Sequence, residues 1–228
     1  MSTALSVNCI TRRVVMLGLG TLLLGCSGSD FDVLEQGGFG GRGGSGYGEL
    51  VDNGHRIPAV DMTETDRGLL RAVVRYNGQY RPGTIVVDVE GRRLYLVTEN
   101  GSAIRYAVGV GREEALNFRG SAVIGRKSEW PSWTPTESMI ARIPKYKKYA
   151  GGMPGGIANP LGARALYLYK DGQDTYFRIH GTNEPESIGQ AVSSGCIRML
   201  NQDVIDLYTR VPVGAPVIVL QQSPKIAG

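Results

Sequence analysis

Apolar and polar residues alternate over short stretches in the first half of the chain's central region, with turn sequences between them. The stretches Thr84–Val89, Arg93–Thr98 and Ala103–Val110 are rich in β-branched and aromatic residues. A period of two indicates strands that bury one face. Asn100-Gly101 separates the second stretch from the third, and this dipeptide is typical of a two-residue hairpin turn. The pattern therefore predicts consecutive antiparallel strands.

The same pattern continues in the second half of the chain. The further predicted strands are Ser121–Lys127, Ala165–Lys170, Thr175–His180 and Pro216–Leu220. Asp171-Gly172-Gln173-Asp174 predicts another hairpin between the second and third of these strands. His180 is thus expected at a strand end, where a rigid sheet can direct a side chain into a cleft lined by loops.

Two short helices are predicted beside the strands. Thr65-Asp66 can cap a helix that continues to Tyr76, and Asn201 can cap a helix that continues to Arg210. The expected fold class is therefore mainly β, a β-sandwich or mixed sheet with few short helices. Residues 81–222 are enough for one folded unit with an adequate core, and residues 49–80 would form an extension before it.

The first 48 residues have the pattern of an export signal and a tether. Arg12-Arg13 precede the apolar run Val14–Leu24, which is too short to span a bilayer, and Leu23-Leu24-Gly25-Cys26 resembles a lipobox. This predicts a lipoprotein signal peptide over residues 1–25 and a lipidated Cys26. The alternative is an ordinary signal peptide cut nearby. Eight of the twelve residues from Gly37 to Gly48 are glycine, so residues 26–48 are expected to be a flexible linker.

The signal peptide and the lipidated cysteine predict a location on the periplasmic face of a cell envelope. By analogy with Gram-negative lipoproteins, Ser27 after the lipidated cysteine favours the outer membrane over the inner one. The net charge of +4 is compatible with an anionic partner or simply with a solvated basic face. The basic residues form no long run and no nucleic-acid motif, so nucleic acid is not an expected partner.

Cysteine usage gives the first indication of chemistry. Cys9 would leave with the signal and Cys26 would carry lipid, so Cys196 is left without a disulfide partner in an oxidising compartment. A thiol needs a base to become a good nucleophile at neutral pH, and His180 can supply one. The alternative is that Cys196 and His180 are both buried core residues. His55, the only other histidine, lies near the linker and is a weaker candidate for the base.

The sequence around these two residues carries a recognisable pattern. Its parts are His180-Gly181-Thr182-Asn183, then Ser193-Ser194-Gly195-Cys196-Ile197-Arg198-Met199, with Asn159-Pro160-Leu161-Gly162 and Pro82-Gly83-Thr84-Ile85 upstream. Together they resemble the YkuD-type catalytic domain of the L,D-transpeptidases, of the ErfK/YbiS-like kind. The resemblance extends from Arg81 to Gln222. Many members have histidine where this chain has Ser194.

The resemblance implies an acyltransferase of peptidoglycan biosynthesis, and hence of cell-wall organisation and cell shape. Cys196 would be the nucleophile and His180 the general base and acid, with peptidoglycan stem peptides as partners. No cofactor is implied, and two histidines without a metal-binding motif argue against a zinc site. The residues expected to hold the oxyanion or the substrate are Ser194, Gly195, Arg198, Gly181 and Ser193. Arg198 has two interpretations: it orients a substrate carboxylate or it braces the loop.

Three functions remain open from the sequence. The first is L,D-transpeptidation, with 3→3 cross-links or attachment of a protein to peptidoglycan. The second is an L,D-specific hydrolase or carboxypeptidase, in which water accepts the acyl group. The third is a non-catalytic lipoprotein that binds the cell wall. Residues 130–156, with both tryptophans and several cations, are either an insertion that faces the substrate or a surface loop held by buried Trp130 and Trp133.

Overall fold

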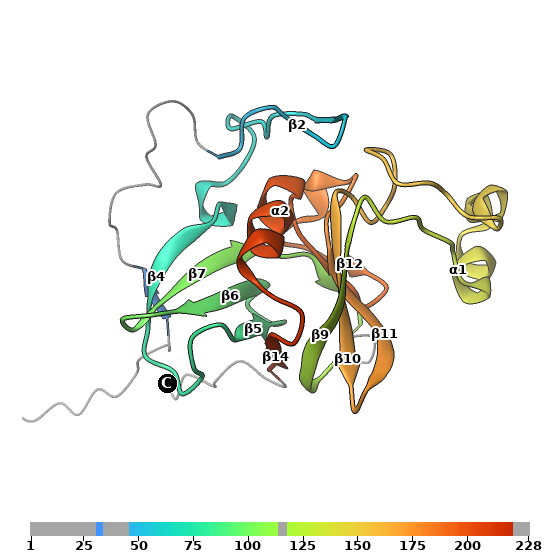
Figure 1. Ribbon diagram of the computed structural model, residues 1–228. Helices are drawn as coiled ribbons and strands as arrows, with labels where there is room; N and C mark the ends of the chain where they lie inside the picture. The colour runs from blue at the N-terminus through green and yellow to red at the C-terminus, as the bar shows by residue number, and fades with distance from the viewer. Residues whose placement is uncertain (1–30, 34–45, 114–117, 221–228) are drawn as a thin grey trace, which may run out of the picture.

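Ten strands form one mixed sheet in the computed structural model, which describes residues 31–33, 46–113 and 118–220 (Figure 1). In spatial order they are β1 (Phe31–Val33), β4 (Ala72–Tyr76), β7 (Ser102–Ala107), β6 (Arg93–Thr98), β5 (Ile85–Asp88), β14 (Pro216–Val219), β9 (Gly120–Glu129), β10 (Arg164–Lys170), β11 (Gln173–His180) and β13 (Ile197–Arg198). β14 runs parallel to β5, and β13 runs parallel to β11. The expected mainly β fold with a mixed sheet and few short helices is confirmed. The signal peptide, Cys26 and most of the glycine-rich linker lie outside the described residues.

The hairpins have the turn chemistry that the sequence indicates. Asn100 and Gly101 have φ angles of 59° and 65°, and Asp171 and Gly172 have φ angles of 51° and 77°. Two consecutive left-handed residues match the right-handed twist of the flanking strands, which explains why Asn-Gly and Asp-Gly occur here. They join β6 to β7 and β10 to β11.

The helix predicted from Thr65 to Tyr76 is wrong. The carboxylate of Asp66 accepts from the Gly68 N–H at 2.9 Å, but it caps only the single 3₁₀ turn η1 (Arg67–Leu69). Gly68 weakens a longer helix, and the β-branched Val73 and Val74 prefer a strand. They lie in β4, where Val74 is buried and pairs with β7.

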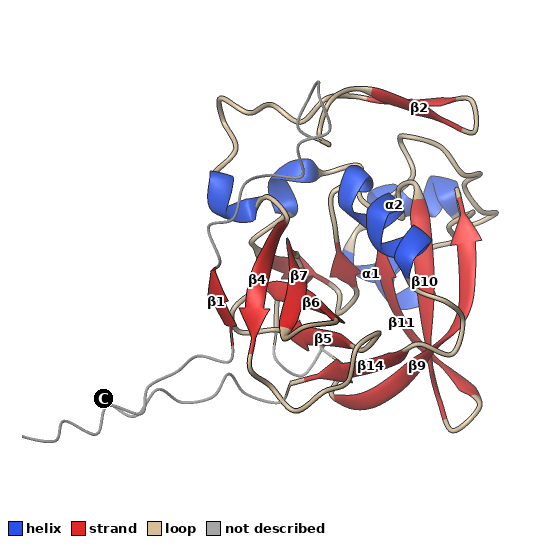
Figure 2. Cartoon of the chain, turned by 60° about the vertical axis from the view of Figure 1, so that its left-hand side comes forward, coloured by secondary structure: helices blue, strands red, loops and turns tan. Residues whose placement is uncertain are grey.

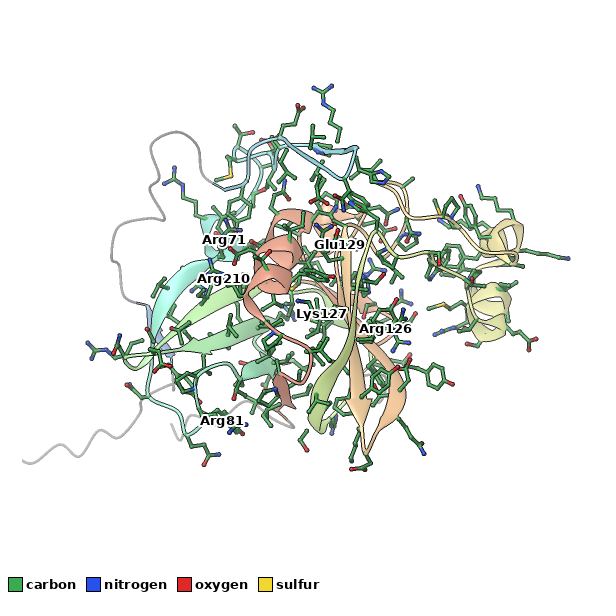
Figure 3. The ribbon with its side chains drawn as sticks, viewed as in Figure 1. Arg71, Arg81, Arg126, Lys127, Glu129 and Arg210 are labelled. Atoms are coloured by element: carbon green, nitrogen blue, oxygen red, sulfur yellow. The ribbon has the colours of Figure 1, made fainter. Side chains whose placement is uncertain are left out.

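The main hydrophobic core lies between the sheet and helix α2 (Asn201–Arg210), which crosses in front of the strands (Figure 2). Val204 and Leu207 of α2 are fully buried in that core. Lys127 of β9 donates to the carbonyls of Tyr208 at 2.6 Å and Val211 at 2.7 Å. These bonds satisfy carbonyls that the end of α2 leaves unpaired, and Figure 3 shows Lys127 beside the helix.

The prediction that Asn201 is the N-cap of α2 is wrong. The capping position is Leu200, which has no side-chain capping bond, and Asn201 is the first residue of the helix. The Asn201 side chain instead bonds two distant backbone segments, as described below. At the other end Arg210 lies in the last turn, where a cation is favourable, and forms an ion pair with Asp206 at 2.8 Å.

The segment before β4 is tied to the sheet by two clusters of hydrogen bonds, one half-buried and one buried. Arg164 of β10 donates two hydrogen bonds to Asp52, at 2.7 and 2.8 Å, and Trp130 donates to the same carboxylate at 2.7 Å. These contacts fix the hairpin of β2 (Leu50–Asp52) and β3 (His55–Ile57), and the His55 ring lies 4.0 Å from the Trp130 ring. His55 is therefore part of a structural contact.

The second cluster surrounds Asp203 at the start of α2. Tyr47 donates to Asp203 at 2.8 Å, and Arg71 donates to the same oxygen at 3.2 Å. Figure 3 places Arg71 near the upper end of α2. Tyr47 is 4% exposed, so the folded part begins inside the stretch that the glycine content marks as linker.

Residues 130–156 contain two short helices that extend outward from the sheet (Figure 1). They are α1 (Glu137–Arg142) and η3 (Pro144–Tyr149). At the base of this insertion, buried Asn159 donates to the carbonyls of Pro131 at 3.1 Å and Pro154 at 2.9 Å. In the part of the chain that the structure describes, no helix is both long enough and apolar enough to cross a membrane.

Candidate functional site

His180 is the last residue of β11 and is 5% exposed. Its Nδ1 lies 2.6 Å from the backbone carbonyl oxygen of Gly181. A carbonyl oxygen only accepts, so Nδ1 carries the proton in this contact, and Nε2 of the neutral ring has a free lone pair. The backbone thus selects the tautomer that can act as a base through Nε2.

The surroundings of His180 keep its ring neutral. Burial lowers the pKa of His180 to about 4, the positive charges of Arg198 and Arg178 lower it further, and the Gly181 carbonyl opposes the shift. Burial disfavours the charged form because it removes water from the imidazolium. At neutral pH the ring is therefore an unprotonated base.

Cys196 is the only free cysteine in the described residues and is partly exposed. It lies between β12 (Ala191–Ser193) and β13. The parallel pairing of β13 with β11 sets Ile197 beside Ile179 and Arg198 beside His180, so Cys196, the residue before β13, lies beside the strand that ends in His180. Burial raises the pKa of the Cys196 thiol, while the backbone of Arg178 and the charges of Arg178 and Arg198 oppose that rise.

The loop that carries Cys196 is held by Ser193. The Ser193 hydroxyl donates to the carbonyl of Cys196 at 2.7 Å and accepts from the backbone N–H of Gly195 at 3.0 Å. The φ angle of Gly195 is 120°, which a residue with a side chain rarely adopts. The Gly195 N–H, expected at the oxyanion, is thus occupied by Ser193. Ser194 is exposed, and no acceptor among the described residues contacts its N–H or that of Cys196.

Asn201 supports the segment that follows His180, and sequence reasoning missed this role. Its Oδ1 accepts from the Ala163 N–H at 2.9 Å, and its Nδ2 donates to the Thr182 carbonyl at 2.8 Å. A Cβ on Gly162 or on Gly181 would lie 2.2 Å from that Oδ1. Both glycines are therefore required by close packing, and Gly181 has a structural role that places its carbonyl on His180.

Two arginines surround the pair. Arg198 forms an ion pair with Glu184 at 2.7 Å, which is the bracing arrangement considered from the sequence. Arg178 was not expected. It pairs with Asp174 at 2.7 Å, and its guanidinium lies 4.4 Å from the centre of the Tyr167 ring. Its position two residues before His180 on the same strand was the available signal, since alternate residues share a face.

On the Tyr167 ring, Arg126 makes a second cation–π contact at 3.5 Å. Tyr167 pairs with Arg126 of β9 and with Arg178 of β11 in the sheet register, so the three side chains form a cross-strand row. Figure 3 shows Arg126 on the side of the sheet nearer the insertion. This row places Arg178 on the strand that carries His180 and Arg126 two strands away, on β9.

A pocket of about 210 Å³ lies between the insertion and the segment that follows His180. We call it the basic pocket. Its lining residues are Trp133, Lys145, Tyr146, Lys148, Tyr149, Met153, Ala158, Pro160, Asn183, Glu184 and Arg198. Trp133 is 9% exposed and contacts Tyr146 edge-on at 5.1 Å, so it both holds the insertion and borders the pocket. Trp130, which bonds Asp52, is structural.

Across the described ranges, no three His, Cys, Asp or Glu side chains gather as a metal site.

Comparison with known proteins follows the same residues. The family model of the YkuD L,D-transpeptidase catalytic domain matches residues 82–219. The chain is 35% identical over 146 residues to "Probable L,D-transpeptidase ErfK/SrfK" of Escherichia coli K12, covering 62% of this chain and 45% of that protein. It is 37% identical over 137 residues to a putative L,D-transpeptidase encoded in the ATP synthase region of Fuscovulum blasticum, covering 60% of this chain and 68% of that protein.

The chain thus spans about half the length of the first of these relatives. Among solved structures, one from Brucella melitensis is 48% identical and covers 70% of this chain and 99% of its own, with a TM-score of 0.47. That protein is described as a probable carnitine operon oxidoreductase. A TM-score of this size carries no argument about fold or activity, so the fold rests on the strands described above.

Proposed function

The chain belongs to the YkuD family of L,D-transpeptidase catalytic domains, and from this premise we propose that it joins peptidoglycan stem peptides through a thioester on Cys196. The products would be 3→3 cross-links or a protein attached to peptidoglycan. The observation that carries the proposal is the 2.6 Å contact between His180 Nδ1 and the Gly181 carbonyl, which leaves Nε2 free as the base. A buried histidine held only for packing would not need this tautomer.

In the first half of the reaction, Nε2 of His180 takes the proton from the Cys196 thiol as the sulfur attacks the carbonyl of the diamino acid in a tetrapeptide stem. The backbone N–H groups of Ser194 and Cys196, which no described acceptor contacts, would hold the oxyanion of the tetrahedral intermediate. The intermediate collapses as His180 returns the proton to the leaving amine, so D-alanine departs and a thioester remains.

In the second half, an amine on another stem or on a protein attacks the thioester. His180 removes a proton from that nitrogen and delivers it to the cysteine sulfur as the carbon–sulfur bond breaks. A new amide forms and the thiol is restored. The same thioester would give a hydrolase if water reached it, so the choice of acceptor depends on binding.

The basic pocket suits the donor stem. Lys145, Lys148 and Arg198 provide positive charge, and stem peptides carry free carboxylates. Tyr146 and Tyr149 provide flat apolar surface beside these cations. Asn183 and Arg198, which line this pocket, lie three residues after His180 and two residues after Cys196, so a stem bound here would approach the candidate pair.

We also propose a location for the protein in the cell. The lipobox-like Leu23-Leu24-Gly25-Cys26 and the glycine-rich stretch after it support a lipid-anchored protein on the periplasmic side of the envelope. The outer membrane is the favoured anchor. Radiolabelled palmitate incorporation into the parent chain and into Cys26→Ala would test it: label in both would refute lipidation at this cysteine.

The activity is tested by incubating the full chain, in detergent, with purified disaccharide-tetrapeptide and identifying products by mass spectrometry. We expect free D-alanine and a cross-linked dimer, both lost in Cys196→Ala. D-alanine with tripeptide and no dimer would indicate hydrolysis or a missing protein acceptor. No turnover, together with intact binding to sacculi, would refute the proposal and favour a cell-wall-binding protein.

A further inference from the structure

A groove of about 620 Å³ separates the segment 57–69 from the start of α2 and from residues 182–190. We call it the acidic groove. One wall, 57–69, lies before the residues that the family model matches. The other wall includes Thr182 and Asn183, which lie two and three residues after His180. The groove therefore lies between a segment outside the matched catalytic domain and the segment that follows His180.

The floor of the acidic groove is apolar and well supported. Ile57, Ile188 and Leu200 line it, and each is at most 4% exposed. Ile188 and Leu200 belong to a buried cluster with Tyr47, against which Leu69 packs. A floor held in this way is preformed, which lowers the entropy cost of binding an aliphatic group.

The rim of the groove carries one sign of charge. Its ionisable lining residues are Asp61, Glu64, Asp66 and Glu186, and none of the lining residues is a lysine, an arginine or a histidine. This is unexpected in a chain with a net charge of +4. All four are exposed, and none forms an ion pair with another described residue. Asp61 and Asp66 bond only nearby groups of their own loop.

The acidic groove and the basic pocket meet at Asn183, which lines both. One contains three cations and a single carboxylate that is paired with Arg198, whereas the other contains four unpaired carboxylates. A transpeptidase must distinguish two substrates. The donor presents carboxylates near the bond that is cut, and the acceptor presents an amine that is protonated in solution.

We propose that the acidic groove binds the acceptor, a peptide that carries an aliphatic side chain and an ammonium group. This inference rests on the proposed function. The aliphatic part would lie on the floor while the ammonium is attracted to the rim, and the amine would lose one proton to water before it reaches the thioester. The groove thereby assigns the two substrates to opposite sides of Asn183 and makes acceptor choice a property of residues 57–69.

Binding is tested without turnover, in the full chain carrying Cys196→Ala, by calorimetric titration with N-acetyl-leucyl-lysine amide. We expect saturable binding that weakens as salt is raised from 50 to 300 mM, since exposed charges are screened over about 10 Å. Adding Glu64→Gln/Glu186→Gln should weaken it about fivefold, the combined effect of two exposed charges. A matched control, Glu99→Gln/Glu137→Gln, removes two exposed charges elsewhere and should leave the affinity unchanged.

Three outcomes overturn the proposal. The first is equal affinity for the same peptide with its lysine side-chain nitrogen acetylated. The second is an equal loss of affinity in the groove variant and the control variant. The third is the absence of saturable binding. An intact fold is verified by circular dichroism of every variant.

A second assay separates this proposal from the proposed function. With the active chain, D-alanine release from donor alone tests the thioester, while the KM for added acceptor amine tests the groove. Release of D-alanine with an acceptor KM that the groove variants do not change would refute the groove alone. Binding of the lysine peptide without any D-alanine release would instead refute the proposed function and leave the groove standing.

Discussion

Asn201→Ala is the substitution that best tests how the structure holds its base. The side chain is 7% exposed and joins α2 to two segments that are far apart in sequence. It accepts from Ala163 at 2.9 Å and donates to Thr182 at 2.8 Å. Removing it leaves a buried N–H and a buried carbonyl without partners on either side of the His180-Gly181 pair.

The expected cost follows from these two bonds. Each lost bond costs about 1 kcal/mol net, and a buried group left unpaired raises that to between about 1 and 3 kcal/mol. Alanine is slightly better than asparagine inside a helix, which offsets a few tenths of a kcal/mol. We therefore expect Asn201→Ala to lower the free energy of unfolding by about 3 kcal/mol. For a domain of this size that corresponds to a Tm lower by about 6–12 °C.

The assay pairs thermal unfolding with D-alanine release measured well below the lowered Tm. If Asn201 positions His180 through Gly181, kcat should fall at least tenfold in the folded variant while the donor KM changes little. Asn201→Asp keeps the acceptor for Ala163 but sets a carboxylate against the Thr182 carbonyl, so it should fail in the same way. A variant that loses stability but keeps full kcat would refute the positioning role, and unchanged stability would refute the hydrogen-bond reasoning itself.

Three further predictions concern charged and titrating groups. Burial raises the pKa of the Cys196 thiol, so alkylation by iodoacetamide should be slower than that of free cysteine at pH 7 and should still rise above pH 9; a plateau below pH 8 would contradict this. Burial raises the folded-state pKa of Asp203 to about 7, from an ordinary value of 3.8, so stability from its protonated form is lost as pH rises towards and through 7. In urea titrations Asp203→Asn should therefore gain stability relative to the parent between pH 4 and pH 8, and a constant difference would refute the shift. Asp52→Ala leaves Arg164, whose side chain is 6% exposed, with only the more distant carboxylate of Glu129, at 3.9 Å; we expect a loss of about 3 kcal/mol in the free energy of unfolding, with Lys170→Ala as an exposed control that stays within about 0.5 kcal/mol.

The strands were predictable because their signal is local. Arg93–Thr98 was predicted with the bounds that β6 has, and the turns at Asn100 and Asp171 followed from residue types that tolerate positive φ. The segment after Thr65 shows where local signals fail. Its apolar residues fit a helical spacing, but Val74 is buried between β1 and β7, and that tertiary pairing decides for a strand.

The residues of the candidate site could be predicted from the sequence, but the contacts that hold them could not. Cys196 and His180 were identified from residue chemistry and family resemblance. The support around them depends on contacts over long sequence separations, such as Asn201 with Ala163, which no local pattern contains. Tyr47 is a similar case, because a tyrosine among glycines carries no sign that Asp203, far along the chain, will accept its hydroxyl.

Burial shifts the pKa values of the two candidate catalytic groups in opposite directions, and these shifts determine the protonation state of the pair before substrate binds. It lowers the pKa of His180 and raises the pKa of Cys196, since each charged form loses water. The resting pair is therefore imidazole and thiol, with little thiolate until the proton moves. A neutral thiol is a poor target for oxidants, which suits a lone cysteine in the oxidising compartment that the N-terminal sequence predicts. The charges of Arg178 and Arg198 oppose the rise in the thiol pKa, so proton transfer from the thiol to His180 costs less than burial alone would make it cost.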